Sequence, residues 1–316
     1  MVKGTILCID EGLVKRGDAL PSVNVLSQHL GFARQTIVSA YKELKERGIV
    51  TSKNRKGYFV ASESTSQVMS VALVLYAFHP FQEGFYNTFR SSLGDTIQVD
   101  AFFHHNNLDV LEDTITKISG HYGYYVIASM DHPRMGSILN SLPMGRVLAI
   151  DRPPPAEHKG PFISQQFEEP TLRILTNLRE RISKYTGIVL FYRAESDFPK
   201  GIAIGVKQFA KANRIKLEIQ SSYISDSLQK GKLYITISDT DLWSLLEDCI
   251  DQNLEVGKDI GVISHNDSKI KKLVCGGIST ISADFNQMAQ HAANYVLSRG
   301  ELQAYEPTVL IDRQSL

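Results

Sequence analysis

The stretch TIVSAYKELKERGIVTSKNRKGYFV, residues 36–60, decides the fold of the first part of the chain. Its first half holds four apolar residues at the spacing i, i+3, i+4, i+7, namely Ile37, Ala40, Tyr41 and Leu44. This spacing predicts a helix with one buried face. The second half holds IVTS and YFVA, two short runs typical of β-strands, around the basic turn from Lys53 to Gly57. We therefore expect a helix followed by a hairpin with a positively charged tip.

A shorter helix is expected immediately before this one. Ser22 follows Pro21 and can cap its start, while Gly31 stands where a left-handed residue ends a helix at least cost. Three apolar residues form its buried face: Val23, Leu26 and Leu30. Two helices joined by so short a turn form a helix-turn-helix. The free face of the second helix is mainly polar and carries Arg34, Gln35, Val38, Ser39 and Lys42.

Charge is distributed unevenly along the 316 residues, although the formal net charge is zero. Residues 1–62 contain ten Lys or Arg against five Asp or Glu, a net charge of +5, and the remainder carries −5. A cationic segment with a polar helix face and a basic hairpin tip suits duplex DNA, whose phosphates supply a large share of binding affinity. The first segment is therefore expected to bind DNA.

The rest of the chain follows a Ser-rich stretch at 61–70 and alternates between strand-like and helix-like segments. Nine apolar runs predict strands: VALVLY, TIQVDAFF, YYVIAS, RVLAID, GIVLFY, IKLEIQ, LYITIS, IGVISH and PTVLIDRQ. Such alternation predicts parallel sheets covered by helices on both faces. The proline-rich run DRPPPAEHKGP, 151–161, is expected to divide this α/β region into two similar lobes with a ligand-binding cleft between them.

The run GDALPSVNVLSQHLGFARQTIVSAYKELKERGIVTSKNRKGYFV resembles the winged helix-turn-helix of the GntR family of bacterial repressors, over about residues 3–61. The resemblance implies that the second helix and the hairpin, or wing, contact DNA through Arg34, Gln35, Thr36, Ser39, Lys42, Arg55, Lys56 and Gly57. Asn24 and Val38 stand where many members carry basic residues. Ala33 replaces the usual capping residue, which typically costs about 1 kcal/mol.

The larger region resembles the effector domain of LacI-type repressors, which is similar to periplasmic sugar-binding proteins. The matching segments are RVLAIDRP, SDTDLWSLLEDCIDQNLEVGKDIGVISHND and ISTISADFNQMAQHAANYVL. The resemblance implies ligand contacts from both lobes, by His79, Phe81, Asp131, Asp151, Lys200, Tyr223, Asp239 and Asn266. Ile202 stands where an arginine often clamps the ligand, which argues against an anionic ligand and favours a neutral sugar such as a pentose or fucose.

The expected fold is therefore α/β, with an amino-terminal winged helix-turn-helix and a two-lobed, periplasmic-binding-protein-like domain of doubly wound parallel sheets. Residues 1–62 form the DNA-binding head, 63–70 a linker and 71–316 the body. Within the body, the first lobe is expected at about 71–158 and 284–302, and the second at about 159–283 and 303–316. Two heads in a homodimer would match a two-fold operator, and ligand would change their spacing.

Structural interpretations of several site residues remain open. Asp239 could cap a helix that begins at Thr240, and Asp151 could pair with Arg152 at the hinge. The histidines at 104, 105, 121 and 132 lack the spacing of a metal site, and no cofactor motif is present. Trp243 is expected in the core.

Other functional classes fit the sequence less well. The chain has no 18-residue apolar run, no secretion signal and only three scattered cysteines, which indicates a cytoplasmic protein without membrane contact. An α/β enzyme acting on a sugar or nucleotide is the alternative, but GxxxxGK[ST], a post-strand GxGxxG and GxSxG are absent. GIAIG, residues 201–205, is read as close helix packing. A transporter's solute receptor would need an export signal. We therefore expect a non-enzymatic, sugar-responsive transcriptional repressor.

Overall fold

The computed structural model describes residues 1–316 except 64, 66–68, 78, 144 and 299, so part of the expected linker lies outside the described residues. The chain forms two compact units. Unit 1 comprises Met1–Phe78, Phe85–Ile163 and Ala289–Ala304. Unit 2 comprises His79–Gly84, Ser164–Met288 and Tyr305–Leu316. The chain therefore passes repeatedly between the two units.

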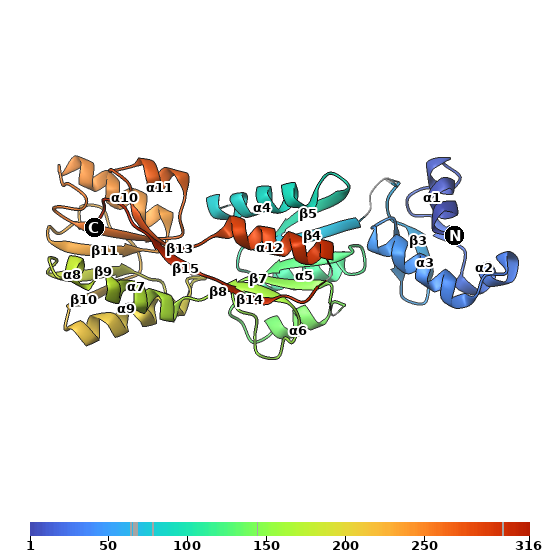
Figure 1. Cartoon of the computed structure of the whole chain (residues 1–316), viewed down its shortest axis with the longest axis horizontal. Helices are drawn as coiled ribbons and strands as arrows, with labels where there is room; N and C mark the ends of the chain where they lie inside the picture. The colour runs from blue at the N-terminus through green and yellow to red at the C-terminus, as the bar shows by residue number, and fades with distance from the viewer. Residues whose placement is uncertain (64, 66–68, 78, 144, 299) are drawn as a thin grey trace. The chain divides into compact units, whose positions relative to one another are not determined.

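The head within unit 1 contains the expected helices and hairpin (Figure 1). Its helices are α1 (Val2–Asp10), α2 (Val23–Leu30) and α3 (Arg34–Glu46). Its strands are β1 (Ala19–Leu20), β2 (Val50–Lys53) and β3 (Gly57–Val60), and they form an antiparallel sheet in the order β1-β3-β2. Helix α1 and the two-residue strand β1 are additions to the predicted pattern.

The ends of α2 and α3 follow the predicted capping chemistry. The Ser22 hydroxyl accepts a hydrogen bond from the Val25 N–H at 3.3 Å, and Gly31 adopts a φ of +67°. Ala33 precedes α3 and gives it no side-chain cap. The turn between the helices is thus specified mainly at the α2 side.

Tyr41 fixes α3 within the head. Its ring stacks on the Tyr58 ring of β3 with 4.1 Å between centroids, and its hydroxyl donates to the Pro21 carbonyl at 2.5 Å. Burial, followed by the neighbouring Tyr58, raises the pKa of Tyr41 to about 12, so the hydroxyl remains a donor at neutral pH. One side chain therefore ties α3 both to the wing and to the segment before α2.

The main sheet of unit 1 has the strand order β14-β8-β7-β6-β4-β5. Its strands are β4 (Met69–Leu75), β5 (Ile97–Phe103), β6 (Tyr124–Ala128), β7 (Val147–Asp151), β8 (Phe162–Gln165) and β14 (Gln303–Glu306). Its helices are α4 (Pro80–Leu93), α5 (Leu108–Ile118), α6 (Met135–Asn140) and α12 (Phe285–Ser298). Strands β5-β4-β6-β7-β8 give the doubly wound order 2-1-3-4-5, whose order reverses between β4 and β6.

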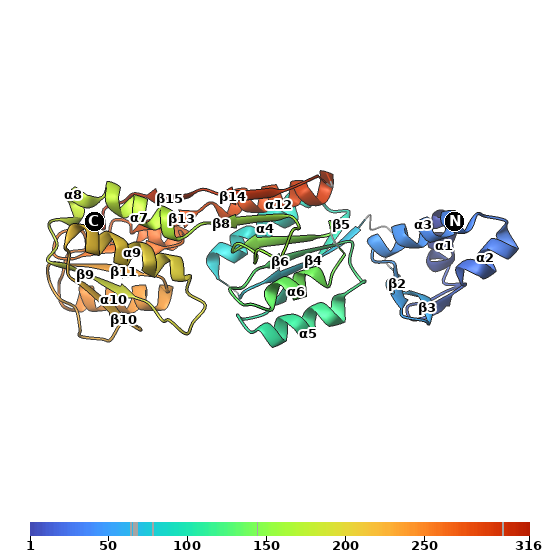
Figure 2. The same ribbon diagram turned by 90° about the horizontal axis from the view of Figure 1, so that it is seen from below.

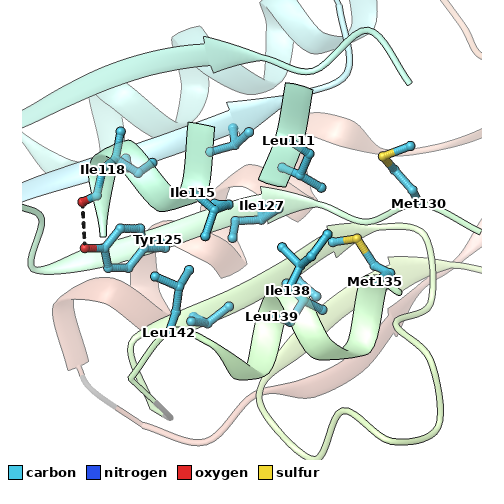
Figure 3. Packing of buried hydrophobic residues seen from close by; sticks show 14 of the residues in the cluster. Leu111, Ile115, Ile118, Tyr125, Ile127, Met130, Met135, Ile138, Leu139 and Leu142 are labelled. Carbon is cyan, nitrogen blue, oxygen red and sulfur yellow. Dashed lines mark hydrogen bonds between the residues drawn. The ribbon is translucent and has the colours of Figure 1, made fainter. Parts of the chain in front are cut away.

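Helices cover both faces of this sheet, with α4 and α12 on one side and α5 and α6 on the other (Figure 2). Adjacent residues of β6 alternate between the faces: Tyr124 meets Tyr295 of α12, and Tyr125 packs among α5 and α6. In that core the Tyr125 hydroxyl donates to the Ile118 carbonyl at 3.1 Å (Figure 3). The buried hydroxyl therefore keeps a hydrogen-bond partner among apolar side chains.

The sheet of unit 2 has the order β10-β9-β11-β12-β13-β15. Its strands are β9 (Gly187–Phe191), β10 (Leu217–Gln220), β11 (Lys232–Thr236), β12 (Gly261–His265), β13 (Ser279–Ala283) and β15 (Thr308–Ile311). Its helices are α7 (Glu168–Asn177), α8 (Arg179–Ile182), α9 (Lys200–Asn213), α10 (Asp239–Asp251) and α11 (Lys269–Leu273). The first five strands repeat the 2-1-3-4-5 order of unit 1, and antiparallel β15 closes one edge.

Unit 2 has a core on each face of its sheet. Helices α7, α8 and α9 contribute to one cluster, and α10 contributes to the other, where Trp243 is partly buried. Gly201 and Gly205 let α9 approach α7 closely, because a Cβ at Gly205 would lie 2.8 Å from the Glu168 carbonyl oxygen. The packing interpretation of GIAIG is confirmed.

The chain passes between the two units a few residues later than the predicted lobe boundaries. The proline-rich run at 151–161 lies within unit 1, and the chain passes to unit 2 after Ile163. Backbone hydrogen bonding explains this, since the Pro161 carbonyl accepts from the Ala149 N–H of β7 at 3.1 Å and holds the run against the sheet. The later crossings fall after Met288 and Ala304, a few residues beyond the predicted boundaries.

Candidate DNA-binding surface and effector site

The predicted DNA-contacting residues of α3 share its exposed face. Ile37, Ala40, Tyr41 and Leu44 are buried in the head core, together with Ile9, Ile49, Val50 and Val60. The five predicted contact residues are all exposed: Arg34, Gln35, Thr36, Ser39 and Lys42. The first turn of α3 holds no acidic residue, so the positive end of the helix dipole is not neutralised there. This face can approach an anionic backbone without removing any core contact.

The wing presents a second basic surface. Arg55, Lys56 and Gly57 are exposed at the tip of the β2–β3 hairpin, where Arg55 has a φ of +59° and Gly57 one of +99°. The Lys56 N–H donates to the Lys53 carbonyl at 3.0 Å and closes the turn. The Lys53 ammonium lies 4.7 Å from the centre of the Phe59 ring, a cation–π contact. The tip is thus a defined turn with basic side chains pointing outward.

In unit 1, candidate effector groups lie beyond the carboxyl ends of the strands. Asp151 is the last residue of β7 and has a φ of +71°, and exposed Asp131 follows β6. Ser129, which directly follows β6, is 4% exposed, and its Oγ has no hydrogen-bond partner within the described part of the chain. Ser129 lies next to the point where the strand order reverses, which is where doubly wound sheets bind ligands. Its position after a buried strand could have identified it from the sequence.

His79 and Phe81 were predicted for the first lobe, but their contacts place them with unit 2. The two rings stack with 5.6 Å between centroids, and Phe81 also packs 4.6 Å from Phe285. The reason is that β4 ends at Leu75, so both residues lie at the start of α4 rather than at a strand end. Phe81 is half-buried and His79 is exposed.

In unit 2 the structure brings Asp239 and Asn266 together through Lys271. The Lys271 Nζ lies 2.7 Å from Asp239 Oδ1 and donates to the carbonyls of His265 at 2.9 Å and Asn266 at 2.8 Å. Lys271 is 1% exposed, and its burial lowers the pKa of the amine while the Asp239 carboxylate opposes that shift. The α10 cap is Ser238, whose Oγ accepts from the Thr240 N–H, so Asp239 does not serve as that cap.

A second ion pair holds the turn after β12. Both carboxylate oxygens of Asp267 accept from the Arg313 guanidinium at 2.7 Å, and Oδ1 also accepts from the Thr280 hydroxyl. Burial raises the pKa of Asp267, but these hydrogen bonds outweigh it and leave the pKa below its ordinary value. Asn266, one residue earlier, has a φ of +57° and a buried Oδ1 without a hydrogen-bond partner among the described residues.

Two predicted ligand contacts lie elsewhere in unit 2. Tyr223 is 9% exposed, packs against Phe191 in the core, and donates its hydroxyl to Asp248. Burial and this hydrogen bond raise the pKa of Tyr223 well above its ordinary value. Lys200 is exposed as the first residue of α9. Tyr223 therefore offers a ligand far less accessible surface than its position after β10 suggested.

Comparisons with known proteins match two separate parts of the chain. Residues 8–60 match the family described as bacterial regulatory proteins, gntR family, and residues 206–316 match the periplasmic binding protein-like domain. Over 53 residues the chain is 43% identical to the uncharacterized HTH-type transcriptional regulator YjiR of Escherichia coli strain K12. That alignment covers 17% of this chain and only 11% of the relative.

Three solved structures share the fold of the body. A LacI family transcriptional regulator from Lactobacillus casei with bound glucose has a TM-score of 0.65 at 17% identity, covering 78% of this chain and 100% of that one. The trehalose repressor from Escherichia coli gives 0.65 at 11% identity, with 78% and 99% covered. A periplasmic binding protein/LacI transcriptional regulator from Alkaliphilus metalliredigens QYMF, complexed with D-xylulofuranose, gives 0.61 at 12% identity, with 78% and 98% covered.

The chain joins a GntR-type helix-turn-helix to a periplasmic-binding-protein-like domain. The GntR-type head supplies an exposed basic surface and the body supplies strand-end polar groups. No helix within the described residues is both long and apolar enough to cross a lipid bilayer. In the same residues, no three His, Cys, Asp or Glu side chains gather in a group that could hold a metal ion.

Sequence reasoning missed Lys271 and Arg313, which organise the strand ends of unit 2. The run KIKK at 269–272 is typical of a solvated surface, and Arg313 lies more than thirty positions from its partner Asp267. The structure pairs two acids with two bases at these strand ends and leaves the buried Asn266 amide oxygen without a hydrogen-bond partner among the described residues. Amide and hydroxyl groups of this kind hydrogen-bond a polyol without requiring a charge on it.

Proposed function

We propose that the protein is a cytoplasmic, ligand-responsive transcriptional repressor whose head binds operator DNA and whose body binds a small neutral sugar. The exposed polar face of α3 beside the basic wing carries this proposal, because both present hydrogen-bond donors and positive charge on one compact domain. Arg34, Gln35 and Thr36 at the start of α3 would contact base edges or adjacent phosphates. Arg55 and Lys56 would contact the neighbouring backbone.

Two observations support a neutral effector. The acids that follow β11 and β12 are paired with bases, Asp239 with Lys271 and Asp267 with Arg313. Buried acceptors without a partner among the described residues, Ser129 Oγ and Asn266 Oδ1, stand beside strand ends where a ligand hydroxyl could donate to them. Structural neighbours hold glucose and D-xylulofuranose. A pentose or fucose fits the same chemistry, with Asp131, Asp151, Lys200, His79 and Phe81 as further candidate contacts.

Repression by a homodimer completes the proposal. A two-fold operator requires two heads, and a ligand that changes their spacing alters DNA affinity, a coupling typically worth about 1–3 kcal/mol. The sugar is bound and released unchanged, since the proposed role needs no turnover.

Operator binding is tested by fluorescence anisotropy on the DNA upstream of the protein's own gene. Arg34→Ala is expected to lower affinity by at least about tenfold, because a specific arginine contact is worth about 1–3 kcal/mol. Lys3→Ala removes the same charge from an exposed position on α1 and serves as the matched control. Equal losses for the two variants would show that only net charge matters and would contradict a recognition role for α3.

Sugar binding is tested by a thermal-shift panel containing L-arabinose, L-fucose, D-xylose, D-glucose and D-galactose, followed by calorimetry on each hit. Binding stabilises the folded protein in proportion to the logarithm of ligand concentration. A hit recovered unchanged after prolonged incubation supports a regulator, whereas its conversion to another compound would support the enzymatic alternative. A panel without any hit would contradict the proposed effector class.

A further inference from the structure

Lys271 acts through other residues rather than by touching a ligand. An ammonium group has three N–H donors, and all three are directed at acceptors 2.7–2.9 Å away: Asp239 Oδ1, the His265 carbonyl and the Asn266 carbonyl. A neutral amine has only two N–H donors and would leave one of these acceptors unsatisfied. The 1% exposure of the side chain leaves no surface for a ligand. Its influence on binding must therefore pass through Asp239 and Asn266.

The two residues that Lys271 holds are candidate ligand contacts at neighbouring strand ends. Asp239 follows β11, and its side chain is 34% exposed although Oδ1 lies against the ammonium. Asn266 follows β12, where its left-handed backbone and its carbonyl bond to Lys271 fix the turn that carries the buried Oδ1. Lys271 thus controls both the charge of one candidate contact and the backbone position of the other.

The structure assigns a selectivity role: we propose that Lys271 is the positioning residue that restricts the effector site to uncharged ligands. Its ammonium cancels the Asp239 carboxylate, just as Arg313 cancels Asp267, so the segments that directly follow β11 and β12 present no net charge. The inference depends on the proposed function, since it concerns the selectivity of that effector site.

Each variant is expected to change the preference of the effector site for cationic or anionic ligands in a defined direction. Lys271→Met leaves the Asp239 carboxylate uncompensated, and an unpaired carboxylate attracts a cation and repels an anion. Asp239→Asn leaves the ammonium uncompensated and has the opposite effect. The double variant Asp239→Asn/Lys271→Met removes both charges and restores the balance. Lys272→Met is the matched control, because Lys272 is an exposed neighbour on the same helix.

The experiment compares three ligands with one carbon skeleton by calorimetry on the full chain. The neutral sugar that binds the wild type best in the panel is set against its aminodeoxy and carboxylate analogues, which for glucose are glucosamine and glucuronate. Each protein is described by two affinity ratios, amino to neutral and carboxylate to neutral. Ratios are used because a loss of fold integrity lowers all three affinities together.

Lys271→Met is expected to raise the amino-to-neutral ratio by about tenfold or more, the scale of a single uncompensated charge at close range. Asp239→Asn is expected to raise the carboxylate-to-neutral ratio. The double variant and Lys272→Met should both keep the wild-type ratios, the double variant with a lower affinity for the neutral sugar because the Asn266 turn is no longer supported.

Ratios unchanged in both Lys271→Met and Asp239→Asn, in proteins that still bind the neutral sugar, would overturn the inference and leave the proposed function standing. A wild-type protein that binds no sugar of the panel would overturn the proposed function and the inference with it. If Lys271→Met does not fold, the other two variants still test the inference. Asp239→Asn must raise the carboxylate-to-neutral ratio, and the double variant must show the wild-type ratios.

Discussion

Two buried side chains in this protein, Tyr41 and His104, carry polar groups with defined hydrogen-bond partners. Tyr41 connects α3 to Tyr58 of the wing by stacking and to Pro21 by a hydrogen bond. His104, at the end of β5, is 1% exposed, and its Nδ1 accepts from the Asn106 N–H at 3.1 Å. Both side chains are buried, so the loss of either hydrogen-bonding group has an energetic consequence that can be measured.

Tyr41→Phe keeps the ring stack but removes the hydroxyl that donates to Pro21, so it should destabilise the head by about 1 kcal/mol. Tyr41→Ala also removes the buried ring and should cost about 3–5 kcal/mol. Native-state hydrogen exchange of the α3 amides measures both changes. Ser39→Ala, on the exposed face, should leave exchange unaffected. Exchange in Tyr41→Phe equal to that of the wild type would show that the hydroxyl contributes nothing to stability.

The pH dependence of stability should carry the signature of His104. Burial lowers the pKa of His104 from 6.5 to about 4 in the folded protein. The unfolded chain therefore binds the proton first, and stability falls as pH falls from about 6.5 towards 4, by about 3 kcal/mol in all. His104→Asn keeps an acceptor for the Asn106 N–H without a titrating ring. The melting temperature of His104→Asn, relative to that of the wild type, should rise as pH falls from about 7 to 4.5. His105→Asn, a substitution at an exposed position, should show no such relative rise. A constant difference across this range would contradict the prediction.

At the scale of elements, a strand could be predicted from the sequence where its residues form a continuous apolar run. All nine apolar runs lie on strands, and parallel strands buried on both faces, such as β6 and β9, are apolar throughout. Strand β13, STISA, was not among them because its hydroxyls are satisfied only by distant partners, as when Arg313 N–H donates to Ser279 Oγ. Strand β14 is a short edge strand, and β8, also of four residues, lies beside it. Composition alone cannot identify polar strands whose hydrogen-bond partners come from tertiary structure.

The site was less predictable than the fold for the same reason. Strand ends could be located from the sequence, and Asp239 and Asn266, which the family resemblance implied, lie just after two of them. Which side chains point inward depends on packing, and so Tyr223 is in the core while Lys271, from a run of lysines, is buried. Burial of a charged residue follows from the position of its partner and not from its neighbours in the chain.

The close approach of α9 to α7 yields a matched pair of substitutions. Gly205→Ala places a Cβ 2.8 Å from the Glu168 carbonyl oxygen and should cost about 1–3 kcal/mol through overpacking. Gly4→Ala, in α1, has no atom within 4 Å of the new Cβ and should stabilise that helix by about 0.5–1 kcal/mol. Hydrogen exchange of the amides in α9 and in α1 would measure the expected destabilisation by Gly205→Ala and the expected stabilisation by Gly4→Ala. Equal effects would show that intrinsic helix propensity, and not interhelix distance, governs both positions.

The wing should contribute affinity without sequence preference. Arg55→Ala/Lys56→Ala removes two exposed charges at its tip, so DNA affinity should fall similarly for all operator sequences. The slope of log affinity against log salt should decrease by about 1 for each phosphate that the wing no longer neutralises. Anisotropy titrations between about 50 and 200 mM KCl would measure it. A variant with the wild-type slope would place the wing away from DNA.

At the scale of the whole molecule, the charge division and the proposed dimer determine how DNA is bound. In the proposed complex the +5 head would face DNA and the −5 remainder would be repelled by it, which favours binding through the heads alone. The chain of 35.3 kDa should form a particle of twice that mass in light scattering. DNA with one half-site destroyed should bind at least about tenfold more weakly, because the second head then meets no specific bases. Equal affinity for DNA with one intact half-site and for DNA with two would contradict binding by a dimer.

The head has a core of its own, built from Ile9, Ile37, Tyr41, Leu44, Ile49, Val50 and Val60. Among the described residues, every member of this core cluster belongs to the head, and Tyr41 holds α3 against the wing of the same head. Under the proposed function, grafting a different head of this build onto residue 61 should therefore redirect the ligand response of the body to a new set of genes.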